Sequence, residues 1–184
     1  LYSDLSSPLA LLHYGDAQEL GSRTAVGANM AVRRDVLDRL GGLTPDLGRR
    51  RGTLLCGEDH DLCQRATVAG LRCEYRPEMR VRHWVPAERA RLRYFARWFF
   101  WSGVTHAILE AYALAADSGG RSAERHFLRQ LILSSFRAAA RLLTGRPRQA
   151  VTAAMDAAFA AGYLVQRIKY LTRGTPTLSR RDPD

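Results

Sequence analysis

Hydrophobic and polar positions change their period along this chain, and the changes predict alternating short strands and helices in its first half. Small and apolar residues in 24–32 predict a strand, and alternation at 72–75 and 80–84 predicts two more. Apolar residues at helical spacing predict short helices at 35–40 and 59–69, each followed by glycine. This order of elements predicts an α/β fold.

The second half of the chain keeps a helical period. A helix that begins at Pro86 is expected to run to about residue 116, with aromatic residues on one side and arginines on another. Two more helices are predicted at 123–143 and 148–171, and residues 174–184 are expected to be disordered. The predicted organisation is a poorly defined lead-in at 1–23, an α/β unit at 24–116 and a helical tail at 117–173.

Composition narrows the class of protein only in part. The 184 residues carry a net charge of +10, mostly from arginine, which favours nucleic acid, anionic membranes or phosphate-bearing substrates as partners. There is no run of about 18 apolar residues that would predict a membrane-spanning helix. Cys56, Cys63 and Cys73 match neither a zinc pattern nor a paired disulfide set, so we expect reduced thiols in a cytosolic protein.

Three carboxylates lie close together at the start of the predicted helix 59–69, in the segment Gly57-Glu58-Asp59-His60-Asp61. Carboxylates at a helix N-terminus interact favourably with the helix dipole, so this cluster has a structural interpretation without any chemistry. A carboxylate is also the usual general base for activating a hydroxyl group. The segment alone does not choose between the two interpretations.

The flanking segments form an ordered series. In order they are Gly27-Ala28-Asn29-Met30-Ala31-Val32-Arg33-Arg34, Leu40-Gly41-Gly42-Leu43, Gly57-Glu58-Asp59, Leu62, Arg65, Ala69-Gly70, Tyr75-Arg76-Pro77 and Val81-Arg82-His83. Over residues 24–103 this series resembles the C-terminal half of an inverting family-two glycosyltransferase with a GT-A fold. The resemblance implies a partial, Rossmann-like α/β domain followed by the helical tail, truncated at its N-terminus. The first residue, Leu1, suits this interpretation of a C-terminal fragment.

The resemblance also implies roles for individual residues. Asp59 corresponds to the general base that takes a proton from the acceptor hydroxyl, and Glu58 is its charged neighbour. Gly27, Ala28, Asn29 and Gly57 fall where the family binds substrate, although simple packing is the alternative, favoured for Gly27. Arg65 and Arg89 are further substrate-binding candidates, but Arg65 is expected to pair with a carboxylate and Arg89 to lie on a solvated helix face.

His83 is the candidate ligand for a divalent cation, Mg²⁺ or Mn²⁺, and a structural histidine is the alternative. Asp59-His60-Asp61 spells the family's metal motif, but it stands in the wrong part of the chain, so Asp61 is expected at the helix surface. The nucleotide-binding half is missing upstream of Gly27. The 184-residue chain alone is therefore expected to have negligible transferase activity.

The expected partners are a nucleotide-sugar donor and a glycan or polyprenyl-linked acceptor, in the cytoplasm at the inner face of the plasma membrane. The aromatic and arginine-rich helix at 88–116 suits a peripheral membrane contact, and packing of its aromatics inside the protein is the alternative. A non-catalytic membrane-surface or assembly fragment is a second function class. A basic nucleic-acid-binding module is a third, disfavoured because no such signature is present. The sequence does not specify the donor sugar, acceptor or linkage.

Overall fold

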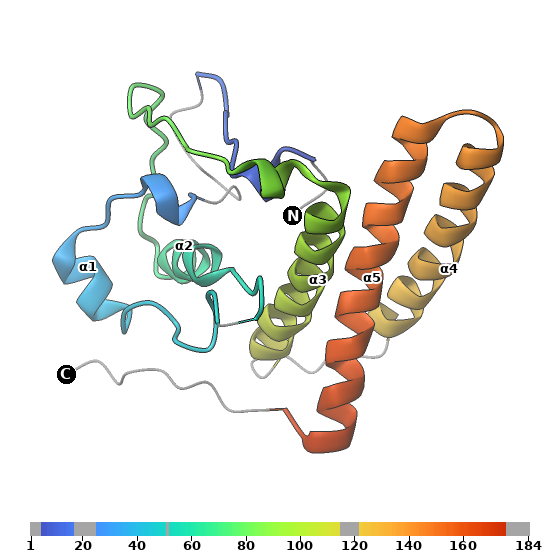
Figure 1. Ribbon diagram of the computed structural model, residues 1–184. Coiled ribbons are helices and arrows are strands. Elements are labelled where there is room, and N and C mark those ends of the chain that lie inside the picture. Colours follow the sequence, from blue (N-terminus) through green and yellow to red (C-terminus); the bar gives the residue numbers. More distant parts are fainter. Residues whose placement is uncertain (1–4, 17–24, 51, 115–121, 176–184) are drawn as a thin grey trace.

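The computed structural model describes residues 5–16, 25–50, 52–114 and 122–175 (Figure 1). Within them the regular structure is helical. The α-helices are α1 Arg34–Arg39, α2 Glu58–Val68, α3 Leu92–Leu114, α4 Ser122–Leu143 and α5 Pro147–Arg173. Short 3₁₀ turns occur at η1 Ser7–Leu9, η2 Gly27–Asn29 and η3 Ala87–Ala90.

The predicted α/β fold is wrong for the described part of the chain, which contains helices and no β-strand or sheet. Val26 and Met30 have extended backbones, but the η2 turn interrupts the strand expected at 24–32. The segment expected at 72–75 has one isolated bridge at Glu74, and 80–84 is irregular. Extended backbone becomes a strand only when a neighbour supplies a hydrogen-bond ladder. Among the described residues these stretches form no such ladder, so the expected partial GT-A fold is not formed in this part of the chain.

The two short predicted helices are confirmed, and their ends follow from glycine. After α1, Gly41 and Gly42 both have positive φ, and the Gly42 N–H donates to the carbonyl of Leu37 at 2.8 Å. After α2, Gly70 has φ +72° and the Leu71 N–H donates to the carbonyl of Ala66 at 2.9 Å. Glycine takes this left-handed conformation with little cost and so satisfies the last carbonyls of each helix.

Helix α3 begins later than predicted because Arg91 has an extended backbone that separates η3 from α3. Its aromatic residues face inward: Trp98 is 6% and Phe99 2% exposed, and both pack with Met155 of α5. This burial favours the packing alternative for these two side chains over membrane contact. Further along α3, Val104 and Ile108 form a second cluster with the loop residues Leu47 and Leu55. Helix α3 therefore joins the N-terminal loops to the C-terminal helices.

The contact between α3 and α5 depends on two glycines. A Cβ atom at Gly103 would lie 2.0 Å from the carbonyl oxygen of Phe159 on α5. A Cβ atom at Gly162 would lie 1.8 Å from the carbonyl oxygen of Phe100 on α3. Real Cβ atoms do not approach another heavy atom this closely, so the two helix backbones touch at a point where no side chain fits.

Helix α5 lies between α3 and α4 (Figure 1). The rings of Phe127 on α4 and Tyr163 on α5 are 3.9 Å apart between centroids. Arg167 Nε donates to Glu124 Oε1 at 2.8 Å, and the Tyr163 hydroxyl donates to Glu110 of α3. The predicted helices at 123–143 and 148–171 are thereby confirmed as an antiparallel pair. Across the described residues, none of the helices combines the length and the apolar character needed to cross a bilayer.

Candidate functional site

The Asp59 carboxylate is held by two backbone N–H groups at the start of α2. Gly27 donates to Oδ2 at 2.9 Å, and His60 donates to Oδ1 at 2.8 Å. Gly27 and Asp59 are 32 positions apart in the sequence but are in contact in the structure. A Cβ atom at Gly27 would lie 3.7 Å from Asp59 Oδ2. The structure therefore brings together the two segments from which the candidate site was predicted. Asp59 is partly exposed, so its remaining lone pairs can be reached from solvent.

Helix α2 is positioned by a contact with α3. Gly57 precedes the helix with φ +114°, and a Cβ there would lie 2.6 Å from Cγ2 of Thr105. The Thr105 hydroxyl also donates to the carbonyl of Cys56 at 2.8 Å. Gly57 is thus explained by close packing of the helix start on α3, and its predicted contact with substrate stays a prediction. Sequence reasoning missed Thr105, and no local signal marks it, because Ser102 and His106 are polar residues in the same stretch of α3.

Glu58 points toward the loop that precedes α2. A Cβ at Gly48 would lie 3.6 Å from the carboxyl carbon of Glu58. Its Oε2 atom is buried and has no hydrogen-bond partner among the described residues. A buried carboxyl oxygen without a partner is costly, and no hydrogen bond among the described residues accounts for the position of this atom beside Asp59.

Asp61 is buried, and the prediction that it lies on the helix surface is wrong. Its side chain is 8% exposed and accepts hydrogen bonds from Thr44 and from Arg65, whose Nε lies 2.9 Å from Oδ2. Arg65 also donates to the backbone carbonyls of Leu40 and Gly42. All three guanidinium nitrogens of Arg65 are therefore engaged: Nε bonds Asp61 within α2, and the other two tie α2 to the carbonyls of Leu40 and Gly42 just after α1. This supports the structural interpretation of Arg65 over the substrate-binding one.

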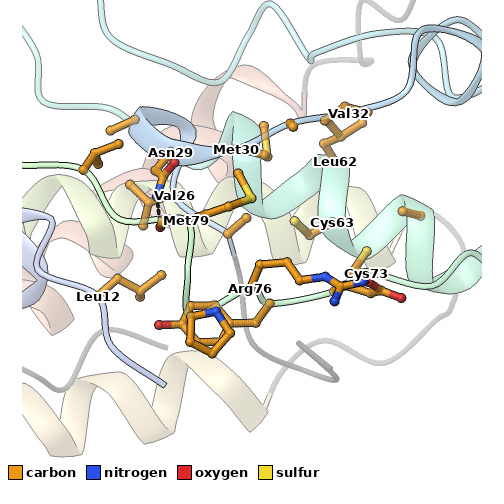
Figure 2. A pocket seen from close by; sticks show the side chains of 18 of the residues that line it. Leu12, Val26, Asn29, Met30, Val32, Leu62, Cys63, Cys73, Arg76 and Met79 are labelled. Atoms are coloured by element: carbon orange, nitrogen blue, oxygen red, sulfur yellow. Dashed lines mark hydrogen bonds and ion pairs between the residues drawn. The ribbon is translucent and has the colours of Figure 1, made fainter. Parts of the chain in front are cut away.

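A cavity of about 1030 Å³ lies beside the candidate base (Figure 2). Its wall is formed by segments 10–13, 25–26, 28–33, 71–77 and 79–81, by Val36, Leu40 and His83, and by the α2 residues Leu62, Cys63 and Ala66. Asn29 Nδ2 donates to the carbonyl of Met79 at 2.7 Å and so joins two of these segments, as the dashed line in Figure 2 shows. Ala28 and Asn29 line the cavity directly after Gly27, whose N–H holds Asp59. The cavity is large enough for a small-molecule ligand.

The cavity lining contains both apolar and basic side chains. Val26, Met30 and Met79 provide the apolar wall, and they are labelled in Figure 2. Arg72 and Arg76 both pair with Glu74. These hydrogen bonds, of which that from Arg72 has the larger effect, hold the pKa of the Glu74 carboxyl below its ordinary value. Arg33, which pairs with Asp35 at 2.7 Å, and Arg80, whose Nε donates to the carbonyl of Pro77 at 3.0 Å, also line the cavity. Such a wall suits a ligand with both an anionic and an apolar part.

His83 lines the cavity and is exposed. In the part of the chain that the structure describes, no three His, Cys, Asp or Glu side chains converge on a common point. The described residues thus provide no preformed group of three ligands, and the divalent cation stays a prediction. His60, next to the candidate base, has its pKa lowered by burial and is neutral at pH 7.

Arg89 lies away from the cavity. Its guanidinium carbon stands 5.9 Å from the ring centroid of Tyr94, at the junction of η3 and α3. This placement does not bring Arg89 to Asp59 or to the cavity lining. Its predicted substrate contact stays a prediction without support from the geometry.

The Cys56 thiol gives a prediction for pH dependence. Burial raises its pKa to about 11 from 9.0, so the unfolded chain loses this proton at lower pH than the folded chain does. Between these values the unfolded state binds fewer protons, and stability falls as pH rises. We expect a loss of about 2 kcal/mol of unfolding free energy from Cys56 across this window. Burial also raises the pKa of Cys63 and therefore adds a loss in the same direction.

Urea unfolding of the parent and of Cys56→Ala at pH values from about 8 to about 11 measures this difference. The variant should lose clearly less stability than the parent over this pH range, because it has no thiol at position 56 to ionise. Its backbone contacts with Thr105 do not need the side chain and are retained. Burial raises the pKa of Tyr112 to about 12, so its ionisation lowers the stability of parent and variant equally at the upper end of this pH range. Equal losses in parent and variant would contradict the assignment to Cys56.

Comparisons of this chain with family models, with curated proteins and with solved structures find no match.

Proposed function

We propose that this chain carries the acceptor-side, general-base part of an inverting glycosyltransferase, with Asp59 as the base. The observation that carries the proposal is the hydrogen bond from the Gly27 N–H to Asp59 Oδ2. It joins the Gly-Ala-Asn segment and the Gly-Glu-Asp segment, the same two segments on which the resemblance to family-two enzymes rests. The proposal does not depend on a sheet within this chain, because contacts of α2 with α1 and α3 hold the base.

The geometry of Asp59 suits proton transfer from a hydroxyl. A carboxylate has about four lone-pair sites, and the N–H groups of Gly27 and His60 use two of them. A free site accepts the proton while the acceptor oxygen forms its bond to the anomeric carbon of the donor sugar. At the same time the bond from that carbon to the nucleoside diphosphate breaks, and its electrons leave with the diphosphate. Attack from the opposite face inverts the anomeric centre.

The cavity suits the kind of substrate that the proposal requires. Basic side chains at the lining, among them Arg80 and Arg33, which also pairs with Asp35, attract the phosphate groups of a nucleotide sugar or a lipid-linked acceptor. The apolar wall with Val26, Met30 and Met79 suits the first isoprene units of a polyprenyl chain. Asn29 offers its side-chain oxygen to a sugar hydroxyl, since its amide nitrogen is engaged by Met79. We expect a cytoplasmic location at the inner face of the plasma membrane, because family members use lipid-linked acceptors there.

The divalent cation stays a prediction. His83 offers one imidazole at the cavity, but the described residues provide no group of three ligands. No step of the proposed reaction is assigned to a metal ion.

Asp59→Asn in the full-length gene product tests the proposal. We expect turnover to fall by about 10²- to 10⁴-fold, the usual contribution of a general base. Release of nucleoside diphosphate from UDP- and GDP-sugars in the presence of a polyprenyl-phosphate-linked acceptor measures this rate. Circular dichroism and the unfolding midpoint show whether the variant keeps the helical fold.

Asp38→Asn is the matched control, because Asp38 is also a helical carboxylate but is exposed and paired with Arg34 on α1. It should leave turnover unchanged. A folded Asp59→Asn protein with the turnover of the parent would remove Asp59 from the mechanism.

A further inference from the structure

Helix α4 exposes a row of large apolar side chains that the protein does not cover. It packs on α5 with one face, which includes Phe127, Leu131 and the buried Ser134. On the opposite face Leu128, Ile132, Phe136 and Leu143 recur at helical spacing, and their exposure reaches 78% at Phe136 and 89% at Leu143. We call this surface, together with Arg125 and Arg129, the outer face of α4. It forms one side of the described part of the molecule (Figure 1).

The outer face of α4 is cationic as well as apolar. Arg125 and Arg129 are exposed at its N-terminal end, and Arg146 and Arg148 are exposed just beyond its C-terminal end. Helices α4 and α5 contain the carboxylates Glu124 and Asp156. Glu124 is turned inward to Arg167, and Asp156 is half-buried on α5 with Arg137 as its charged neighbour. The positive charges of this face therefore have no acidic neighbours among α4 and α5 to neutralise them.

We propose that the outer face of α4 docks onto an anionic lipid membrane, with the helix parallel to the surface. An amphipathic helix with arginines beside large apolar residues binds at the level of the headgroups, where acyl chains take the apolar side chains and phosphates take the guanidinium groups. Phe136, Ile132 and Leu143 would leave water, and Arg125 and Arg129 would reach upward to the phosphates. This proposal is independent of the proposed glycosyltransferase chemistry at Asp59.

Charge selects a lipid surface over a second copy of this chain. Two copies that paired these faces would bring arginines against arginines in either helix direction, because both ends of the face are basic. A nucleic acid would meet the arginines but leave the aliphatic row, Leu128, Ile132 and Leu143, without an apolar partner. An anionic membrane satisfies both the charge and the apolar area.

Vesicle sedimentation of the full chain tests this proposal. We expect binding to phosphatidylcholine vesicles that contain phosphatidylglycerol, much weaker binding to phosphatidylcholine alone, and weakening by salt. Ile132→Gln/Phe136→Gln removes apolar area and should lower the partition coefficient by at least about 10-fold. Arg125→Gln/Arg129→Gln removes two charges and should lower it by about 10- to 30-fold on the anionic vesicles only.

Val68→Gln and Arg34→Gln are matched controls, since Val68 is 84% exposed on α2 and Arg34 is exposed on α1. They should leave vesicle binding unchanged. All four substituted positions on α4 are exposed, so circular dichroism should show the parent's helix content. Absence of binding to anionic vesicles, or binding that both α4 variants retain, would overturn the proposal. Light scattering that shows a dimer broken by Ile132→Gln/Phe136→Gln would overturn it in favour of a second copy.

Discussion

Gly162→Ala is expected to destabilise the protein by at least about 3 kcal/mol, although alanine is the better helix former. Alanine gains about 1 kcal/mol over glycine within a helix. Its Cβ atom, however, would lie 1.8 Å from the carbonyl oxygen of Phe100, and a backbone atom cannot rotate away. Either α5 moves off α3 or the local helix distorts, and both disturb the packing of Trp98 and Phe99 on Met155. Urea unfolding followed by circular dichroism measures the loss.

Ala154→Leu is the control for this experiment, because Ala154 is exposed on the same helix and leucine is also a good helix former. It should change stability by less than about 0.5 kcal/mol. Gly103→Ala should resemble Gly162→Ala, since its Cβ would lie 2.0 Å from the carbonyl oxygen of Phe159. Gly162→Ala with the stability of the parent would show that α3 and α5 are not in backbone contact.

Arg65→Met is expected to cost about 3–5 kcal/mol of stability, because it leaves the buried Asp61 carboxylate without its cation. The side chains of Arg65 and Asp61 are only 15% and 8% exposed, and Arg65 also supports the carbonyls of Leu40 and Gly42. Adding Asp61→Asn should restore about half of the loss, since no unpaired charge remains and asparagine still accepts the hydrogen bond of Thr44. Equilibrium unfolding of the two single variants and the double variant measures the coupling between the side chains.

The surface pair of Arg34 and Asp38 is the matched control, with the same separation of four residues but side chains that are 86% and 64% exposed. Arg34→Met should cost less than about 0.5 kcal/mol. The result also decides between the two interpretations of Arg65. A substrate-binding arginine would affect turnover and leave stability unchanged, and that outcome would contradict the structural role.

The helices could be predicted from sequence because their signals are local. Glycines mark the ends of α1 and α2, and Pro147 stands at the start of α5, so each boundary depends on a few neighbouring residues. Strands depend on a partner that is distant in sequence. The small and apolar residues around Val26 do favour extended backbone, but a periodic pattern does not show whether a ladder partner exists. The error in fold class therefore arose from missing strand pairing and, at Gly27–Asn29, from a 3₁₀ turn inside the segment predicted to be extended.

For the candidate site, too, the order of segments along the chain was informative, and the packing of side chains was not. The order of segments along the chain led to Gly27 and Asp59, which are in contact. It did not show that Asp61 is buried, because two residues along a helix point about 200° apart and the buried side must be known first. One signal was available: Arg65 stands four residues after Asp61, a spacing that favours an ion pair. The hydrogen bond from Thr105 to Cys56 depends on how α3 packs against the segment that precedes α2, and no local pattern reports that packing.

The close approach of α3, α5 and the start of α2 also suggests how distant relatives of this chain could be recognised. Gly57, Gly103 and Gly162 each stand where a side chain would collide with a neighbouring helix, and Thr105 provides one of the contacted atoms. Sequences that share this arrangement can differ at most surface positions and at many core positions, but they must keep very small residues at these three positions. A glycine before an acidic helix start, a Gly-x-Thr within an aromatic helix and a glycine in the final helix together form a pattern for identifying them.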